Sequence, residues 1–254
     1  EGAGLASSLS EALALVFLIF RTAMRKDIRE FRLFRFARLS RELNDKILEL
    51  SLPLVVQNLL SMGAWLVFFL FIEKIGKHEL AISNLGRCAY MIGMTPVWGF
   101  SVAANSMVSN IIGQDRSGEV LRLVNRIIGL SMLATTLVTL LMFLFTRQVL
   151  GIFTDDAELI YHSIGTFRIV LVSMYFFTAA IVLISAVSGT GATRTALYIE
   201  FAAILAYCIY IYVTTFVYRT SVEVVWLSEL VYWSLIGIAS YGYLSGSKWK
   251  KITV

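Results

Sequence analysis

The sequence predicts an all-α polytopic membrane protein with seven transmembrane helices, the last six of which form one bundle. Three observations support this fold class. Apolar residues make up 58% of the 254 residues, and the mean hydropathy is +0.77. Charged residues make up only 15%, well below the roughly 25% typical of soluble domains. Seven apolar stretches are each long enough to cross a bilayer, which takes about 20 helical residues.

The seven predicted spans are separated by short, more polar connections. Their boundaries follow from the length of each apolar run and from the near-absence of charge within it. They cover approximately residues 3–20, 47–72, 81–112, 127–146, 161–187, 196–218 and 226–244.

Lysine and arginine are distributed unequally between the two ends of these spans. Sixteen lie on the side of the first connection and of the C-terminus, and four lie on the opposite side. Because cytoplasmic loops carry the excess of basic residues, we expect a plasma (inner) membrane protein with a cytoplasmic C-terminus. Seven crossings then place residue 1 outside.

The connection 21–46 contains nine of these basic residues, interleaved with phenylalanine and leucine. This pattern is typical of a cationic helix that lies on the inner membrane surface and contacts anionic membrane lipid. We expect it to link two bundles. A role in binding nucleic acid is not expected, because the run lies between two spanning helices.

The segment 81–114 contains polar side chains within a stretch long enough to cross the bilayer. Polar residues at this depth usually serve a function, so we expect the segment to line a substrate or ion pathway. Its expected pathway residues are Asn84, Arg87, Trp98 and Asn105. Glycine and proline weaken or kink a helix, so we expect a hinge at Gly93, Pro96 and Gly99. The alternative is a kinked structural helix whose asparagines bond to neighbouring helices.

The second predicted span, 47–72, contains a similar combination of proline and polar groups. Pro53 removes one backbone hydrogen bond and is expected to bend the helix one turn inside the membrane. Asn58 and Ser61 share one helix face, where an amide oxygen can bind a cation or a drug. Equally, these side chains can lock neighbouring helices together.

Two arginines, Arg87 and Arg168, lie inside predicted spans, about two turns from the outer surface. The simpler interpretation is that both extend toward the outer headgroups. The functional alternative is that they pair with Glu73 or with the Asp155–Asp156 pair to gate an outer opening.

Glu200 is the carboxylate that lies well inside an apolar run of the C-terminal half, in YIEFAAILAY. An ionisable side chain inside the membrane is a candidate carrier of a proton or another cation. An ion pair with Arg194 is the alternative. Glu11 and Glu49 have the same two interpretations.

No enzyme motif is present. The sequence lacks HExxH and GxSxG, and its two histidines, His78 and His162, are far apart in the chain. The glycine-containing turn 188–194 lacks the lysine of a phosphate-binding loop. Cys88 and Cys208 both lie in apolar runs and are expected to be packed thiols. We therefore expect neither catalysis nor a metal site, and no bound cofactor.

Several stretches together resemble the multidrug and toxic compound extrusion (MATE) family. GFSVAANSMVSNIIGQDRSGEV (residues 99–120) is similar to an apolar helix, Gly-Gln turn and charged loop of that family. SGTGATR (188–194) resembles its R-G-x-G-D-T-R loop, and LSLPLVVQNL resembles the start of its seventh helix. EGAGLAS at the N-terminus resembles the start of its sixth.

The resemblance implies twelve helices in two lobes of six. Residues 1–20 would be the last helix of a missing N-terminal lobe, 21–46 the basic interlobe linker, and 47–254 the C-terminal lobe. The implied function is an antiporter in which entry of Na⁺ or H⁺ drives export of organic, often cationic, compounds by alternating access between the lobes. Its partners would be small organic cations and the missing lobe.

Two departures from the family pattern affect this expectation. Ala192 stands where the family loop often has aspartate. Members with a sodium site in this lobe use carboxylates in the seventh and tenth helices, and the matching stretches here have none. Coupling would then depend on Glu200 or on acids outside this chain. The alternatives are a flippase for lipid-linked saccharides and a seven-helix membrane sensor.

Overall fold

The computed structural model describes residues 2–24, 40–246 and 249. The chain divides into two compact units, Glu1–Lys46 and Ile47–Val254. In the first unit, α1 spans Gly2–Met24. The long helix α2, Arg41–Ile75, begins in the first unit and continues into the second.

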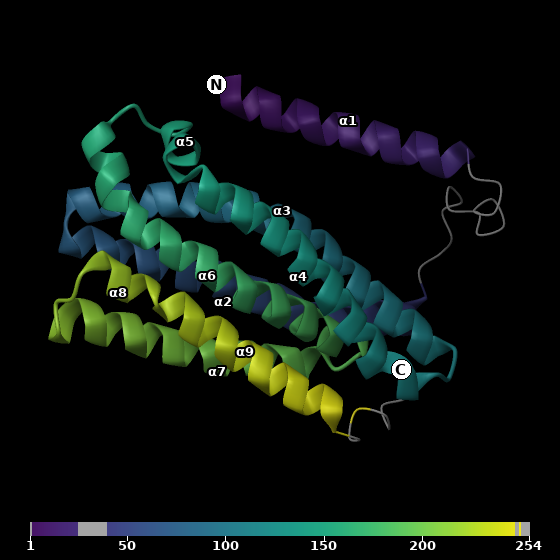
Figure 1. Ribbon diagram of the computed structural model, residues 1–254. Helices are drawn as coiled ribbons and strands as arrows, with labels where there is room; N and C mark the ends of the chain where they lie inside the picture. The colour runs from purple at the N-terminus through teal and green to yellow at the C-terminus, as the bar shows by residue number, and fades with distance from the viewer. Residues whose placement is uncertain (1, 25–39, 247–248, 250–254) are drawn as a thin grey trace. The chain divides into compact units, whose positions relative to one another are not determined.

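The second unit is a bundle of long helices joined by short turns (Figure 1). After α2, the long helices are α3 (Lys77–Gly113), α4 (Val120–Leu144), α6 (Ala157–Gly189), α7 (Thr193–Tyr212) and α9 (Ser228–Ser245). The shorter elements are a 3₁₀ turn at Ser117–Glu119, α5 (Thr146–Gly151), a π-helical turn at Val213–Val217 and α8 (Val222–Trp226).

Local signals fix both ends of α6. Asp156 caps its N-terminus, and its carboxylate accepts hydrogen bonds from the backbone N–H of Glu158 and Leu159 at 3.0 and 3.1 Å. At the other end, Gly191 has φ of 84°, a conformation that favours glycine. The chain therefore turns sharply between α6 and α7, and α7 runs back along the bundle.

The helices α3 and α6 form the centre of the bundle. They pack along each other, α4 packs against both, and α9 packs against α6 and α7 (Figure 1). Buried residues cover almost the whole length of α6, from Ser163 to Gly189. Helices α3 and α6 form one side of the candidate site, and α2, α7 and α9 supply the rest of its lining.

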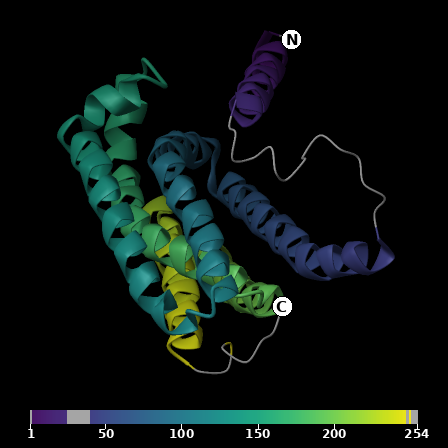
Figure 2. The ribbon, with the colours of Figure 1, turned by 90° about the vertical axis from the view of Figure 1, so that its right-hand side faces the viewer.

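Helix α2 lies farther from the bundle than α3 and α6 lie from each other (Figure 2). It contacts its neighbours through long side chains. Phe68 packs edge-on against Trp226 with ring centroids 5.1 Å apart, and Phe71 packs against Phe216 at 5.0 Å. This spacing leaves room for a cavity between α2 and the bundle.

Six helical segments of the described chain are long and apolar enough to cross a membrane. They include α1, α2, α4, α6, α7 and the α8–α9 pair. Helix α3 has 37 residues and would be about 55 Å long, but its polar residues lower its hydropathy. All seven predicted spans are helical, and α3 is the one that is less apolar than the six candidates.

Some helices extend beyond the predicted spans. The fourth span, predicted to begin at 127, begins as α4 at Val120, and α5 follows it as a separate short helix. The seventh was predicted from 226, but helix starts at Val222. Of the predicted linker 21–46, residues 21–24 belong to α1 and 41–46 to α2. Most of the rest lies outside the described residues.

Gly189, at the end of α6, approaches the backbone of α3 closely. A Cβ atom at this position would lie 2.7 Å from the backbone oxygen of Asn105 and 3.1 Å from its Cα. The hydroxyl of Ser109 donates a hydrogen bond to the Gly189 carbonyl at 2.9 Å. The two helices can approach this closely only because residue 189 has no side chain.

Gly189→Ala is expected to destabilise the protein by about 1–3 kcal/mol, because backbone atoms cannot move aside as a flexible side chain can. Gly99→Ala is the matched control, since a Cβ there meets nothing within 4 Å. Thermal unfolding of the purified variants measures both. Equal melting temperatures for the two variants would contradict the close contact.

Candidate functional site

A cavity of about 540 Å³ lies between α2, α3, α6, α7 and α9. Its lining is mostly aromatic and aliphatic, with several methionines and two carboxylates. The lining residues are Gln57, Asn58, Ser61, Met62, Ala64, Trp65, Met91, Met94, Trp98, Phe177, Ile181, Ile184, Glu200, Tyr207, Glu229, Tyr232 and Trp233.

Four of the pathway residues predicted from the sequence line this one cavity. Asn58 and Ser61 come from α2, Trp98 from α3 and Glu200 from α7. The Asn58 amide donates to the Leu54 carbonyl of its own helix at 2.8 Å, so it does not lock α2 to a neighbour. The structure thus brings together residues that lie up to 142 positions apart in the chain.

Glu200 lies about two turns into α7, and its side chain points inward. It is 4% exposed, and its Oε1 accepts hydrogen bonds from the hydroxyls of Ser61, at 2.5 Å, and of Tyr232. The alternative partner, Arg194, instead forms an ion pair with Glu49 at 3.0 Å. The predicted ion pair between Glu200 and Arg194 is therefore wrong. For Glu49, the ion-pair interpretation holds, because Glu49 is the partner of Arg194.

Glu229 is a second buried carboxylate that the sequence analysis did not single out. It is 1% exposed. Its carboxylate oxygens accept hydrogen bonds from Trp233 Nε1 at 2.9 Å, Tyr207 OH at 3.2 Å and Tyr90 OH at 3.4 Å. Because α8 and α9 together begin at Val222, Glu229 lies about two turns from the helix end, deeper than the predicted start at 226 placed it.

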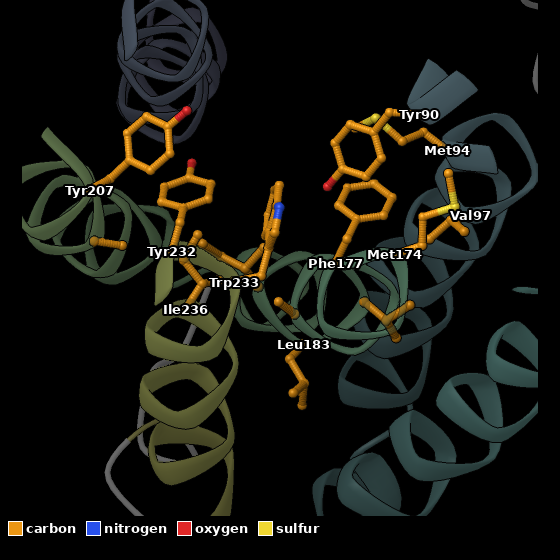
Figure 3. Packing of buried hydrophobic residues seen from close by; sticks show 14 of the residues in the cluster. Tyr90, Met94, Val97, Met174, Phe177, Leu183, Tyr207, Tyr232, Trp233 and Ile236 are labelled. Carbon is orange, nitrogen blue, oxygen red and sulfur yellow. The ribbon is translucent and has the colours of Figure 1, made fainter. Parts of the chain in front are cut away.

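Five aromatic rings form a row (Figure 3), and four of them donate hydrogen bonds to the two carboxylates. Adjacent ring centroids are 4.6–5.9 Å apart in the order Tyr207, Tyr232, Trp233, Phe177 and Tyr90. This aromatic row comes from α3, α6, α7 and α9. Its hydroxyl and indole groups hold the carboxylates, and all its residues except Tyr90 line the cavity.

The donors that hold Glu200 and Glu229 are all neutral. They are a serine hydroxyl, three tyrosine hydroxyls and one indole N–H. Within the described residues, neither carboxylate is hydrogen-bonded to a lysine, arginine or histidine. A buried negative charge without a positive partner is unfavourable, so the cavity is suited to a cation.

The remaining predicted pathway residues do not line this cavity. Asn84 is not among its lining residues. The Arg87 guanidinium lies over the ring of Phe69, 5.3 Å from its centroid. Asn105 lines a different cavity of about 700 Å³, next to the turn between α6 and α7. Across residues 2–24 and 40–246, neither Arg87 nor Arg168 forms an ion pair with an acid.

The expected hinge residues lie within uninterrupted helix. Both α2 and α3 continue through their prolines, Pro53 and Pro96. At Gly93, a Cβ would lie 2.4 Å from the Met174 terminal methyl group, so this glycine makes room for a side chain of α6. Gly99 has open space around it. A hinge at these positions stays a prediction.

No group of three or more histidine, cysteine, aspartate or glutamate side chains that could hold a metal ion occurs in the described part of the chain. Cys88 and Cys208 are free and half-buried.

Among the described residues that line the cavity, only Glu200 and Glu229 carry a formal charge.

Comparison with known proteins identifies the family. The sequence model described as MatE matches residues 53–213, which is more than half of the chain. The chain belongs to the MatE family. The resemblance inferred from its motifs is thereby confirmed, and the chain is a multi-pass membrane protein.

Individual relatives agree with the family assignment. The chain is 26% identical over 159 residues to a probable multidrug resistance protein, NorM, of Thermotoga maritima. An outward-facing multidrug resistance MATE family transporter superposes with a TM-score of 0.74 at 18% identity over 82% of this chain. A mutant of the Vibrio cholerae MATE transporter VcmN gives 0.73 at 14% identity, also over 82%.

The matched region is only part of each relative. The alignment covers 63% of this MatE chain and 34% of the NorM protein. The structural superpositions cover 47% of the outward-facing transporter and 49% of the VcmN mutant. At this level of identity, the solved structures show that the fold is shared.

The carboxylates of this MatE chain lie on other helices than the family resemblance implied. The resemblance placed sodium-site acids in the stretches that form α2 and α6, and the matching positions contain none here. The buried acids are on α7 and α9 instead. The cavity is lined by residues of all four of these helices.

Proposed function

We propose that this chain is part of a cation-coupled antiporter that exports organic cations by alternating access. The observation that supports this function best is the cavity that combines Glu200, Glu229 and the aromatic row. Na⁺ or H⁺ would be the coupling ion. The protein would act in the inner membrane with its C-terminus in the cytoplasm, as the distribution of basic residues indicates.

The cavity has the size and chemistry that an organic cation requires. Its volume of about 540 Å³ lies within the range of about 300–1,000 Å³ for small-molecule sites. An organic cation would place its charge near Glu200 or Glu229 and its apolar part on the rings of Trp98 and the aromatic row. Cation–π contacts of this kind contribute about 2 kcal/mol when they are desolvated.

Coupling would arise because a substrate and a coupling ion need the same carboxylates. Entry of H⁺ or Na⁺ from one side neutralises Glu200 or Glu229 and weakens the hold on the organic cation, which then leaves. A ligand can shift an equilibrium only by its differential affinity for the two states. Here that difference comes from the charge of the two side chains.

The lobe arrangement is part of the same proposal. Residues 1–20 would be the last helix of an N-terminal lobe, and the 47–254 bundle would rock against that lobe. The family membership and the partial coverage of the solved relatives support this organisation.

The proposal is tested by transport in vesicles. The full-length protein, reconstituted with its membrane potential clamped, should exchange ethidium against an imposed Na⁺ or H⁺ gradient. Protein-free vesicles and a collapsed gradient are the controls. Efflux that is the same with and without both gradients would contradict coupling, and absence of any ethidium exchange would contradict the substrate class.

The flippase alternative is less well supported. A carrier of lipid-linked saccharides needs basic residues to bind a pyrophosphate, and the described lining of this cavity contains two carboxylates and no lysine or arginine. Transport of a pyrophosphate lipid, with no exchange of ethidium, would favour it.

A further inference from the structure

Arg168 is an exposed arginine inside an apolar helix. It belongs to α6, Ala157–Gly189, and directly precedes the most apolar stretch of that helix. It lies eleven residues from the start of the helix, about 16 Å along its axis. Among the residues that the structure describes, no carboxylate or other acceptor is bonded to its guanidinium. A guanidinium in this position needs an anion.

A groove of about 310 Å³ lies beside Arg168, between α4 and α6. Its lining residues are Thr136, Thr139, Leu140, Phe143, Arg168, Leu171, Val172 and Tyr175. The hydroxyls in it already have partners: Thr139 and Tyr175 bond to each other at 2.8 Å, and Thr136 donates to its own helix. Among these described lining residues, Arg168 is therefore the polar one that forms no hydrogen bond.

The surface that continues from the groove is apolar. One face of α4 is buried against α3 and α6, and the other exposes large apolar side chains. These exposed residues are Leu130, Leu133, Leu137, Leu140, Leu141, Phe143 and Leu144. A helix with an exposed face of this composition is suited to contact with lipid chains.

The order of residues along the groove gives it a direction. Arg168 lies toward the N-terminal end of α6, and Leu171, Val172 and Tyr175 follow toward the middle of the helix. Because Thr139 of α4 bonds to Tyr175 and Thr135 bonds to Thr178, the two helices are antiparallel. From Arg168 to Tyr175, the groove follows α6 for about 10 Å, and its lining there is mostly apolar.

We propose that the groove between α4 and α6 binds an anionic phospholipid, with Arg168 holding the phosphate and one acyl chain lying along α4. The arginine can donate to two phosphate oxygens at once. The negative headgroup would balance the charge of Arg168, for which the described part of the protein provides no carboxylate partner. This site is separate from the cavity of Glu200 and Glu229, and it does not depend on the transport function.

The test is lipid binding to the full-length protein in detergent, measured by native mass spectrometry. The probes are phosphatidylglycerol, phosphatidylcholine of the same chain length, and inorganic phosphate. The wild type should bind phosphatidylglycerol about fivefold more tightly than phosphatidylcholine, as expected for one basic residue at the membrane surface. Arg168→Gln should reduce this ratio to near one, and Arg168→Lys should retain most of it.

Two further variants make the test specific. Arg147→Gln removes another exposed charge, on α5 and outside the groove, and should keep the wild-type ratio. Leu140→Trp fills the groove without changing charge and should weaken binding of both lipids, with folding checked by thermal unfolding.

Three results would overturn the proposal. The first is an unchanged ratio in Arg168→Gln. The second is a wild type that does not distinguish the two lipids, as expected if a protein segment covers the groove. The third is inorganic phosphate binding at Arg168 as tightly as phosphatidylglycerol, which would make this a simple anion site.

Discussion

Glu229→Gln is expected to abolish coupled export and to weaken ethidium binding by about tenfold or more. The change removes the negative charge while keeping the side-chain shape. The glutamine oxygen can still accept from Trp233 Nε1 while its NH₂ group donates to the Tyr207 hydroxyl, so the charge is the main loss. A tenfold loss corresponds to about 1.4 kcal/mol, and the attraction between two unit charges about 4 Å apart near a protein surface is about 4 kcal/mol.

The measurement is a fluorescence titration with ethidium, followed by efflux from vesicles. Glu49→Gln is the matched control: it makes the same chemical change at an exposed glutamate that pairs with Arg194 outside the cavity. Glu49→Gln should bind and export as the wild type does. If a well-folded Glu229→Gln protein binds ethidium with wild-type affinity, Glu229 has no part in the cation site.

Trp226→Ala is expected to lower the free energy of unfolding by about 3–5 kcal/mol. Trp226 is 1% exposed and joins three helices. Its ring packs edge-on against Phe68 of α2 at 5.1 Å, and its indole N–H donates to the Ser83 hydroxyl of α3 at 3.1 Å. Removing it leaves a large cavity, and α2 loses a principal contact with the bundle.

Thermal unfolding in detergent measures this loss, and Trp98→Ala is the control. Trp98 is 48% exposed and lines the cavity of Glu200 and Glu229, so under the proposed function its removal should weaken ethidium binding with little change in melting temperature. The two tryptophans thus separate packing from binding. A Trp226→Ala protein that melts with the wild type would show that α2 is held by other contacts.

The transmembrane helices could be predicted from the sequence because the bilayer imposes a simple requirement. A span needs about 20 apolar residues, and each run that satisfies this requirement is helical in the structure. The short elements α5 and α8 were missed because, with six and five residues, they are far shorter than a span. Their existence depends on how the chain packs at the end of the bundle.

The candidate site was only partly predictable, since individual contacts depend on distant residues. Glu200 was found because it is a lone acid in an apolar run. Glu229 was missed because it lies close to the predicted start of its span. A useful signal was its spacing of four residues before Trp233, which on a helix lets the indole donate to the carboxylate. Gly93 was interpreted as a hinge residue, but its neighbour Met174 comes from 81 positions further along the chain.

The neutral donors around Glu200 and Glu229 have a consequence for the direction of flux under the proposed function. Serine, tyrosine and tryptophan can orient a carboxylate but cannot cancel its charge. An alternating-access carrier must close its cavity to water on the way between its two open states, and an empty cavity would then hold uncompensated negative charge. Return without a cation is therefore unfavourable. This arrangement favours obligatory exchange over leak, because each passage requires a positively charged occupant of some kind.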